Sequence, residues 1–454
     1  MKWLDEAVAA GHVTVAGHPS RIAVIDALRA DRAGPVSLRL LRLSSADAPF
    51  TRRAALDLLS CAEAGSPWPE AAAAALARLA DPDDEVRRRA AHLVVRAGGR
   101  DAGLRALGEL TDPVVRTVLA DHLQGSLAHL GEDPLPSVRF LARLEALRVA
   151  PVRQWPPLDG ALLADAGAAA IHLDGVGGRW GRVLCGLGRE RHVHALTARL
   201  LRDPVTRDIG AGLAREACHT WRAAPVALLP LLVRHCGPDV SPAMAEALTT
   251  ASVSRAAMRA HGALFATVAV TPYPRPRHLF GSSSPPQGPV YDSATAAAIL
   301  RAKPVDTGRL RHAPELFGAL LDAGPLSFRQ AAQLYNLTFK RPGRLQAVCA
   351  PLWLRHAGPT AAPRVLALMT PHLDAYGIGE YYAEGLARMG RRALPALPSL
   401  TALIERRTRI PVNDSTRDGE TMLDESLLAA ALAARRAILA DAAPRLPPPT
   451  PERA

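Results

Sequence analysis

One stretch of the chain constrains its fold more than any other, residues 81–99, with the sequence DPDDEVRRRAAHLVVRAGG. Its opening Asp81-Pro82 pair suits a helix N-terminus, because the carboxylate can cap a free N–H and proline there gives up no needed donor. The apolar residues that follow recur at spacings of three and four and so form one stripe along a helix, which a glycine pair then ends. The stretch therefore predicts an amphipathic helix with Asp81 at its N-cap.

Weaker copies of this phrase return further along the chain. They begin at Asp112, Asp133 and Asp203, each followed directly by proline, and a looser copy lies at 50–59. The offset of 31 residues from Asp81 to Asp112 is close to one helical hairpin, and the 70 residues from Asp133 to Asp203 are close to two. The 21 residues between Asp112 and Asp133 are too few, so one copy is out of phase. A chain that repeats one helical phrase in this way is predicted to stack helix pairs.

The spacing of Asp, Val and Arg within these copies resembles the HEAT family of α-solenoids, whose repeat carries an aspartate in the turn between its two helices and a Val-Arg pair early in the second. The resemblance is carried by Asp81, Val86 and Arg87, by Asp133, Val138 and Arg139 at identical spacing, and less closely by Asp112 with Arg116 and Asp203 with Arg207. It is clear over residues 48–148, fainter at 190–220 and general elsewhere. It implies an all-α solenoid of stacked antiparallel helix pairs, without a β-sheet, and a habit of binding macromolecules. The functions of such proteins vary too widely to be inherited.

Breaks in the pattern divide the chain. Prolines around Trp155 interrupt the regular repeats, and the Pro-, Gly- and Ser-rich sequence at 271–289 cannot form a helix. We therefore expect an irregular helical N-terminal cap at residues 1–45, regular HEAT-like repeats at 46–150 and divergent helical repeats at 151–270. A loop or linker follows at 271–290, then C-terminal helical repeats at 291–441 and a disordered Pro-rich tail at 442–454.

Composition narrows the classes of function. Aromatic residues make up only 4% of the 454 residues, which suits helices packed through alanine and leucine. The net charge of +12 points to a polyanionic partner. However, the chain has 52 arginines against three lysines, a bias that GC-rich coding also produces. The charge is therefore a weak indication of nucleic-acid binding.

The cysteines and the N-terminus predict the compartment. Five cysteines lie far apart without a CxxC pair, which disfavours both a zinc site and a disulfide framework and favours reduced thiols. Asp5 and Glu6 stand where a signal peptide would need an apolar run, and no uncharged apolar segment reaches the ~20 residues that span a bilayer. We expect a soluble cytoplasmic protein without membrane contact.

The sequence contains only weak matches to motifs for nucleotide or metal binding. The glycine-rich sequence at 175–181, GVGGRWG, lacks the last glycine of a dinucleotide fingerprint because Trp180 stands there, and no strand precedes it, so a turn is predicted. His192 and His194 are two residues apart in a helical sequence, which turns their side chains away from each other. We predict no catalytic residue, no cofactor and no metal site.

The basic residues remain as candidates for binding. Residues 179–202 contain six arginines and only one acid, Glu190. These arginines could follow a phosphate backbone, but the favoured interpretation is a solvated helix face. The repeat arginines are expected either to form a ladder with aspartates of the next repeat or to point into the groove. The candidates for partner or phosphate binding are Arg52, Arg88, Arg89, Arg116, Arg179, Trp180, Arg182, Arg189 and Arg191. The candidates for repeat structure are Asp81, Val86, Arg87, Asp112, Asp133, Val138, Arg139, Asp203 and Arg207.

Two hypotheses for the function follow. The first is a non-enzymatic scaffold that binds a protein partner through the concave surface of the stack. The alternative is a nucleic-acid-binding protein with a basic concave groove, similar to the HEAT-like DNA glycosylases, whose catalytic pattern cannot be matched to Trp180, Trp221 or Trp353. A weaker option is an accessory role beside an enzyme. Arginines that converge on one strip would favour nucleic acid, whereas arginines that pair with acids would favour the scaffold.

Overall fold

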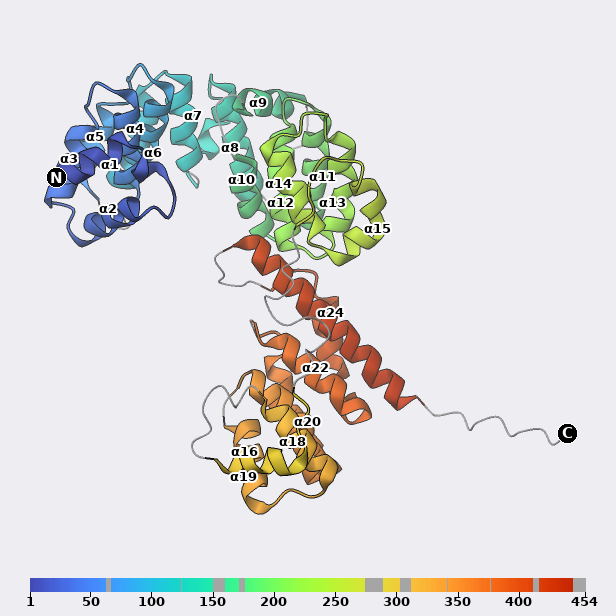
Figure 1. The fold of residues 1–454 in the computed structure, drawn as a ribbon. Coiled ribbons are helices and arrows are strands. Elements are labelled where there is room, and N and C mark those ends of the chain that lie inside the picture. Colours follow the sequence, from blue (N-terminus) through green and yellow to red (C-terminus); the bar gives the residue numbers. More distant parts are fainter. Residues whose placement is uncertain are drawn as a thin grey trace. The chain divides into compact units, whose positions relative to one another are not determined.

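The computed structural model describes residues 1–62, 67–123, 125–149, 160–170, 176–273, 289–302, 312–340, 342–375, 377–410 and 416–443. In these ranges the chain forms α-helices and short 3-10 turns, and its only pairing of extended backbone is an isolated antiparallel bridge between Trp221 and Thr408 (Figure 1). The prediction of an all-α fold without a β-sheet is confirmed. Within the described ranges, every helix is too short or too polar to span a bilayer.

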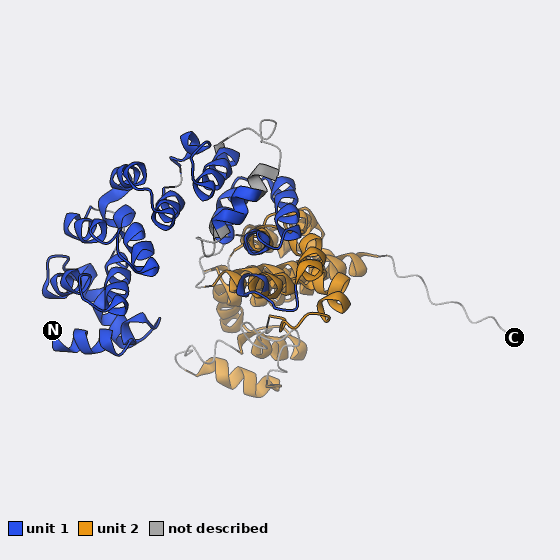
Figure 2. Cartoon of the chain, turned by 90° about the horizontal axis from the view of Figure 1, so that it is seen from above, with its two compact units in different colours: residues 1–216, 237–244 blue, residues 217–236, 245–454 orange. Residues whose placement is uncertain are grey.

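The chain divides into two compact units (Figure 2). The first unit consists of residues 1–216 and 237–244, and the second of residues 217–236 and 245–454. The sequence gives no sign of a division at 216, whereas most of the linker predicted at 271–290, the prolines around Trp155 and the tail from residue 444 lie outside the described residues. The boundaries drawn from the sequence thus stay predictions.

The first unit is built from short helices that pack on their neighbours in the chain, and α6 contacts α4, α5 and α7. Six of its helices begin at a proline, where the missing N–H costs nothing and the fixed φ suits a helix. Its helices are α1 (Lys2–Ala9), α2 (Pro19–Ala30), α3 (Pro35–Leu43), α4 (Pro49–Ser60), α5 (Pro69–Leu76), α6 (Asp84–Glu109), α7 (Pro113–His122), α8 (Pro136–Val149), α9 (Gly160–Ala170), α10 (Val176–Gly186), α11 (Glu190–Arg202) and most of α12 (Arg207–Thr220), with the 3-10 turns η1 (His12–Thr14) and η2 (Ala128–Leu130).

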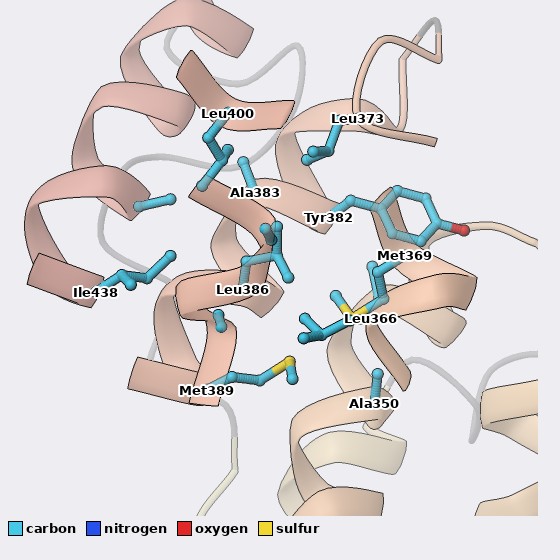
Figure 3. Close-up of a cluster of buried hydrophobic side chains, with 14 of the residues drawn as sticks. Ala350, Leu366, Met369, Leu373, Tyr382, Ala383, Leu386, Met389, Leu400 and Ile438 are labelled. Atoms are coloured by element: carbon cyan, nitrogen blue, oxygen red, sulfur yellow. The ribbon is translucent and has the colours of Figure 1, made fainter. Parts of the chain in front are cut away.

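Two apolar clusters hold together the helices of the second unit from α16 to α24. One cluster joins α20 to α24 through leucine, methionine and alanine side chains and one buried tyrosine (Figure 3). The Tyr382 hydroxyl in this cluster donates to Gln346 Oε1 at 2.6 Å, so its burial leaves no polar group unpaired. The other cluster joins α16, α18, α19 and α20. The helices are α13 (Ala224–His235), α14 (Pro242–Ser252), α15 (Arg255–Phe265), α16 (Ser293–Arg301), α18 (Ala313–Ala323), α19 (Phe328–Phe339), α20 (Arg344–Ala357), α21 (Ala362–Met369), α22 (Gly379–Met389), α23 (Leu397–Glu405) and α24 (Arg417–Ala442), with the turns η4 (Pro359–Ala361), η5 (Thr370–His372) and η6 (Gly390–Ala396).

The helix predicted from residues 81–99 forms, but its cap lies two residues later than expected. Asp83 is the N-cap, and its carboxylate accepts from the Val86 N–H at 2.9 Å. Asp81 is buried and accepts from the Asp83 N–H at 3.1 Å, so the assignment of Asp81 as the cap is wrong. Gly99, with φ of 78°, breaks α6 into two segments where the glycine pair predicts an end.

The prediction of a turn at residues 175–181 is wrong, because residues 176–181 form the first part of α10. Its glycines serve a close approach to α12 within the first unit. A Cβ at Gly177 would lie 2.3 Å from the Ile209 carbonyl oxygen, and a Cβ at Gly181 would lie 2.7 Å from Cβ of Glu216. The spacing of four residues places both glycines on one face of the helix, where they let the two backbones pack closely.

Candidate interaction surfaces

The repeat arginines link successive helices in the first unit. Each lies near the start of its helix, and its guanidinium reaches an aspartate further along the chain. The pairs are Arg87 with Asp112, Arg116 with Asp133 and Arg139 with Asp165. The Arg139 Nη2 to Asp165 Oδ1 distance is 2.7 Å and the Arg87 Nε to Asp112 Oδ2 distance is 3.4 Å. These contacts are a ladder of the kind that the sequence offered as one alternative, and they leave Arg116 bound to protein rather than to a ligand.

Arg52 belongs to the same ladder, which corrects its assignment as a binding candidate. Its side chain is buried, and its Nη2 donates to Asp81 Oδ1 at 2.8 Å. Its Nη1 donates to the carbonyl oxygens of Ala46 and Asp47 at 2.8 and 2.6 Å. Burial acts to raise the pKa of Asp81, but the hydrogen bonds from Arg52 and the Asp83 N–H, with the nearby charges, hold that pKa below its ordinary value. Asp81 is therefore an ionised partner for Arg52 at neutral pH.

Trp180 is also removed from the candidates, because it is fully buried in α10 and cannot stack on a ligand. Arg189 is half-buried and its Nη1 donates to the Leu147 carbonyl oxygen at 2.9 Å. Arg89 pairs with Asp57 at 2.8 Å and with an acid one turn before it in α6. These three residues thus hold the fold together rather than face a partner.

The remaining candidates differ in position. Arg88 is half-buried and makes contacts of its own. Arg207 is half-buried at the start of α12, and the Asp203 carboxylate before it accepts from the Val205 N–H at 2.9 Å. The side chain of Arg179 lies outside the described part of the chain.

The exposed arginines gather on α11. Arg191, Arg199 and Arg202 are exposed, and at about 100° per residue they lie within roughly 80° of one another around the helix. We call these three residues the basic face of α11. Arg182 of α10 is exposed as well. Among the described residues, none of these four guanidinium groups has a carboxylate within ion-pair distance.

A second surface lies in the second unit and escaped the sequence interpretation. Phe328, Tyr335 and Phe339 stand at positions i, i+7 and i+11 of α19, within about 40° of one another around the helix. Trp353 of α20 meets Tyr335 and Phe339 edge-on, with ring centroids 5.4 and 5.8 Å apart. Arg364 of α21 lies over Phe339 at 4.6 Å and donates to the Tyr335 hydroxyl at 2.8 Å. We call these five residues the aromatic surface.

The aromatic surface is partly open to solvent and firmly backed. Phe328 is 92% exposed and Arg364 is exposed, while Tyr335, Phe339 and Trp353 are half-buried. The inner edges of Phe339 and Trp353 pack on the apolar core. Few aromatic residues occur in this chain, so their spacing in residues 325–339, PLSFRQAAQLYNLTF, was a signal that could have revealed the surface.

A buried ionic centre connects distant parts of the second unit. Asp424 of α24 accepts from Arg222 Nε and Nη2 at 2.9 and 2.6 Å and from Arg409 Nη1 at 2.9 Å. Arg409 Nη1 also donates to Glu425 at 3.0 Å. All four side chains are buried, so their charges are balanced within the protein. The 202 residues between Arg222 and Asp424 explain why no local pattern predicts it.

A small surface pocket lies beside this centre, lined by Ile378, Glu380, Ile410 and Leu427 among others. Burial and the charge of Glu384 raise the pKa of Glu380 to about 7, despite the opposing charge of Arg344. Within the described ranges, no three His, Cys, Asp or Glu side chains gather closely enough to hold a metal ion. The aromatic surface and the basic face of α11 thus remain as the two candidate surfaces.

Comparison with known proteins adds little to this description. No protein-family model matches the chain, and no curated protein matches it. Among solved structures, the chain aligns with a crystal structure of an engineered protein at 16% identity, over 88% of this chain and 98% of the other, with a TM-score of 0.23. A TM-score this low carries no argument about fold or function. What the described residues define is an all-α protein with two exposed surfaces of distinct chemistry.

Proposed function

We propose that this protein is a non-enzymatic, HEAT-like scaffold that binds a protein partner, and that the aromatic surface is its main contact. The observation that carries the proposal is the contact cluster of Tyr335, Phe339, Trp353 and Arg364, together with the exposed Phe328 two turns earlier on the same face of α19. Tryptophan, tyrosine and arginine are the residues most enriched among those that dominate protein–protein binding energy. Their presence together at a partly open site favours a protein partner.

Burying this surface under a partner would contribute a large free energy of binding for so small an area. Phe328 is almost fully exposed, and complete burial of such a side chain contributes about 1.5–3 kcal/mol. The half-buried rings of Tyr335 and Trp353 are held by their neighbours, so little side-chain freedom is lost on binding. The gain from burying Phe328 is therefore added to a base of Tyr335 and Trp353 that is already ordered.

The alternative of a nucleic-acid-binding groove has less support. Arg52 and Arg116, two arginines on which that hypothesis depended, form ion pairs with Asp81 and Asp133. Trp180, the aromatic residue beside the predicted phosphate track, is buried. By the criterion drawn from the sequence, arginines that pair with acids favour the scaffold.

Site-specific photo-crosslinking tests the proposal. Benzoylphenylalanine at Ala332, an exposed position of α19 between Phe328 and Tyr335, is irradiated in an extract of the source cells. We expect a discrete protein adduct whose yield falls severalfold when Phe328→Ala is added, because that exposed ring contributes to binding and not to folding. The same probe at Val290, which is 96% exposed in the same unit, is the matched control. Equal adducts at both positions, or an adduct indifferent to Phe328→Ala, would refute the proposal.

A further inference from the structure

The positive charge of the chain is concentrated around α11. Residues 176–202 carry six arginines and one glutamate, a formal charge of +5 out of the +12 of the whole chain. Elsewhere in the first unit, the repeat arginines are matched with aspartates. Three of these arginines, Arg191, Arg199 and Arg202, are exposed and have no carboxylate within ion-pair distance among the described residues, so another molecule can supply their counter-charge.

The geometry of the basic face sets the size of that molecule's contact. Arg191, Arg199 and Arg202 are spread over 12 residues of α11, or about 16 Å along the helix axis. Each guanidinium can hold a carboxylate or phosphate through two parallel hydrogen bonds. A segment with three or four acidic groups spread over about the same length matches this row.

The two ends of α11 distinguish between acidic partners. Leu187, just before the helix, is 40% exposed, and Val205, just after it, is 57% exposed. A phosphate backbone gains nothing from covering leucine and valine, whereas a protein segment does so with its own apolar side chains. We propose that the basic face of α11 docks an acidic protein segment whose apolar residues cover Leu187 and Val205. The basic face of α11 lies in the first unit, and this proposal does not depend on the aromatic surface.

Fluorescence anisotropy tests the docking with defined probes. A fluorescein-labelled, glutamate- and leucine-rich amphipathic peptide is titrated with the full chain at about 150 mM salt, where exposed charges are screened beyond roughly 8 Å. We expect the triple variant R191E/R199E/R202E to raise the Kd at least about tenfold, because three charge pairs are lost and replaced by repulsion. The control R391E/R392E/R436E makes the same change of net charge at exposed arginines of η6 and α24, and it is expected to alter the Kd less than about threefold. A similar loss in both variants, or no peptide binding by the wild type, would overturn the proposal.

A 20-base-pair DNA duplex is the second probe, since its charged backbone carries no apolar side chains. We expect L187S/V205S to weaken the peptide severalfold and to leave any DNA binding unchanged. Should L187S/V205S leave the peptide unaffected while R191E/R199E/R202E abolishes DNA binding, the face is a phosphate site and the proposal fails. The Ala332 crosslink is measured on the same variants and is expected to persist, so the two proposals can fail separately.

Discussion

Replacing Asp424 with alanine is expected to lower the free energy of unfolding by about 3–5 kcal/mol, because it leaves buried positive charge without a partner. The Asp424 side chain has no exposed surface, and it accepts hydrogen bonds from both Arg222 and Arg409. Arg409 keeps Glu425 as a partner at 3.0 Å. Most of the loss therefore falls on Arg222, whose side chain is also buried and whose two bonds to Asp424 both disappear.

An exposed ion pair of the same length provides the control. Asp322 and Arg355 are 2.7 Å apart, close to the 2.6 Å of the Asp424 and Arg222 pair, but their side chains are 70% and 46% exposed. Water solvates both groups when such a pair is broken, so Asp322→Ala is expected to cost less than about 1 kcal/mol. The two aspartates differ in burial and in the number of hydrogen bonds that they accept, so the difference between the two losses reports the buried centre as a whole.

Urea unfolding of the full chain, followed by far-UV circular dichroism, measures both variants. The first transition that shifts in Asp424→Ala reports the second unit, and limited proteolysis of the native protein identifies the segment released. Equal losses for Asp424→Ala and Asp322→Ala, or a loss below about 1 kcal/mol for Asp424→Ala, would refute the reasoning that Asp424 neutralises buried positive charge.

Three further predictions follow from contacts described above. Gly177→Ala is expected to lower the free energy of unfolding by about 1–3 kcal/mol because its Cβ meets the Ile209 backbone, whereas Gly186→Ala, with nothing within 4 Å, is expected to be neutral or slightly stabilising in the same urea assay. Folding raises the pKa of Glu380 from 4.5 to about 7, so the native protein loses stability as the pH rises between these values. Glu380→Gln should therefore raise the free energy of unfolding by about 1–2 kcal/mol at pH 8 and change it little at pH 4, and a gain at pH 4 alone would contradict the sign. Burial, with a smaller effect of a nearby glutamate, raises the pKa of Cys349 to about 12, so peptide mass spectrometry should find it unlabelled by iodoacetamide at pH 8 until denaturant is added.

The local parts of the fold could be predicted from the sequence. The helix after Asp81 follows from the spacing of its apolar residues, which depends only on the geometry of one helix. The N-cap was placed two residues too early because Asp81 and Asp83 have the same side chain and either could cap the helix. In the fold, Arg52 binds Asp81, and Asp83 caps the helix. Gly177 was misjudged for a similar reason, since a glycine that permits a turn also permits a close helix crossing.

The features that the sequence did not predict depend on contacts between residues that are distant in the chain. Arg52 and Arg89 belong to the same sequence pattern as the ladder arginines, yet their partners are known only once the helices are stacked. The aromatic surface joins three helices, and only the α19 residues Phe328, Tyr335 and Phe339 share a spacing that the sequence displays. Trp353 and Arg364 enter it through tertiary packing.

The ionic centre also has a consequence for how the protein is made. In a purely sequential stack, each repeat can settle on the one before it as the chain leaves the ribosome. Arg222, however, waits for Asp424, which is synthesised 202 residues later, or roughly 10–40 s at typical rates of translation. During that interval the Arg222 guanidinium has no Asp424 carboxylate to pair with. The second unit is therefore complete only once α24 has emerged.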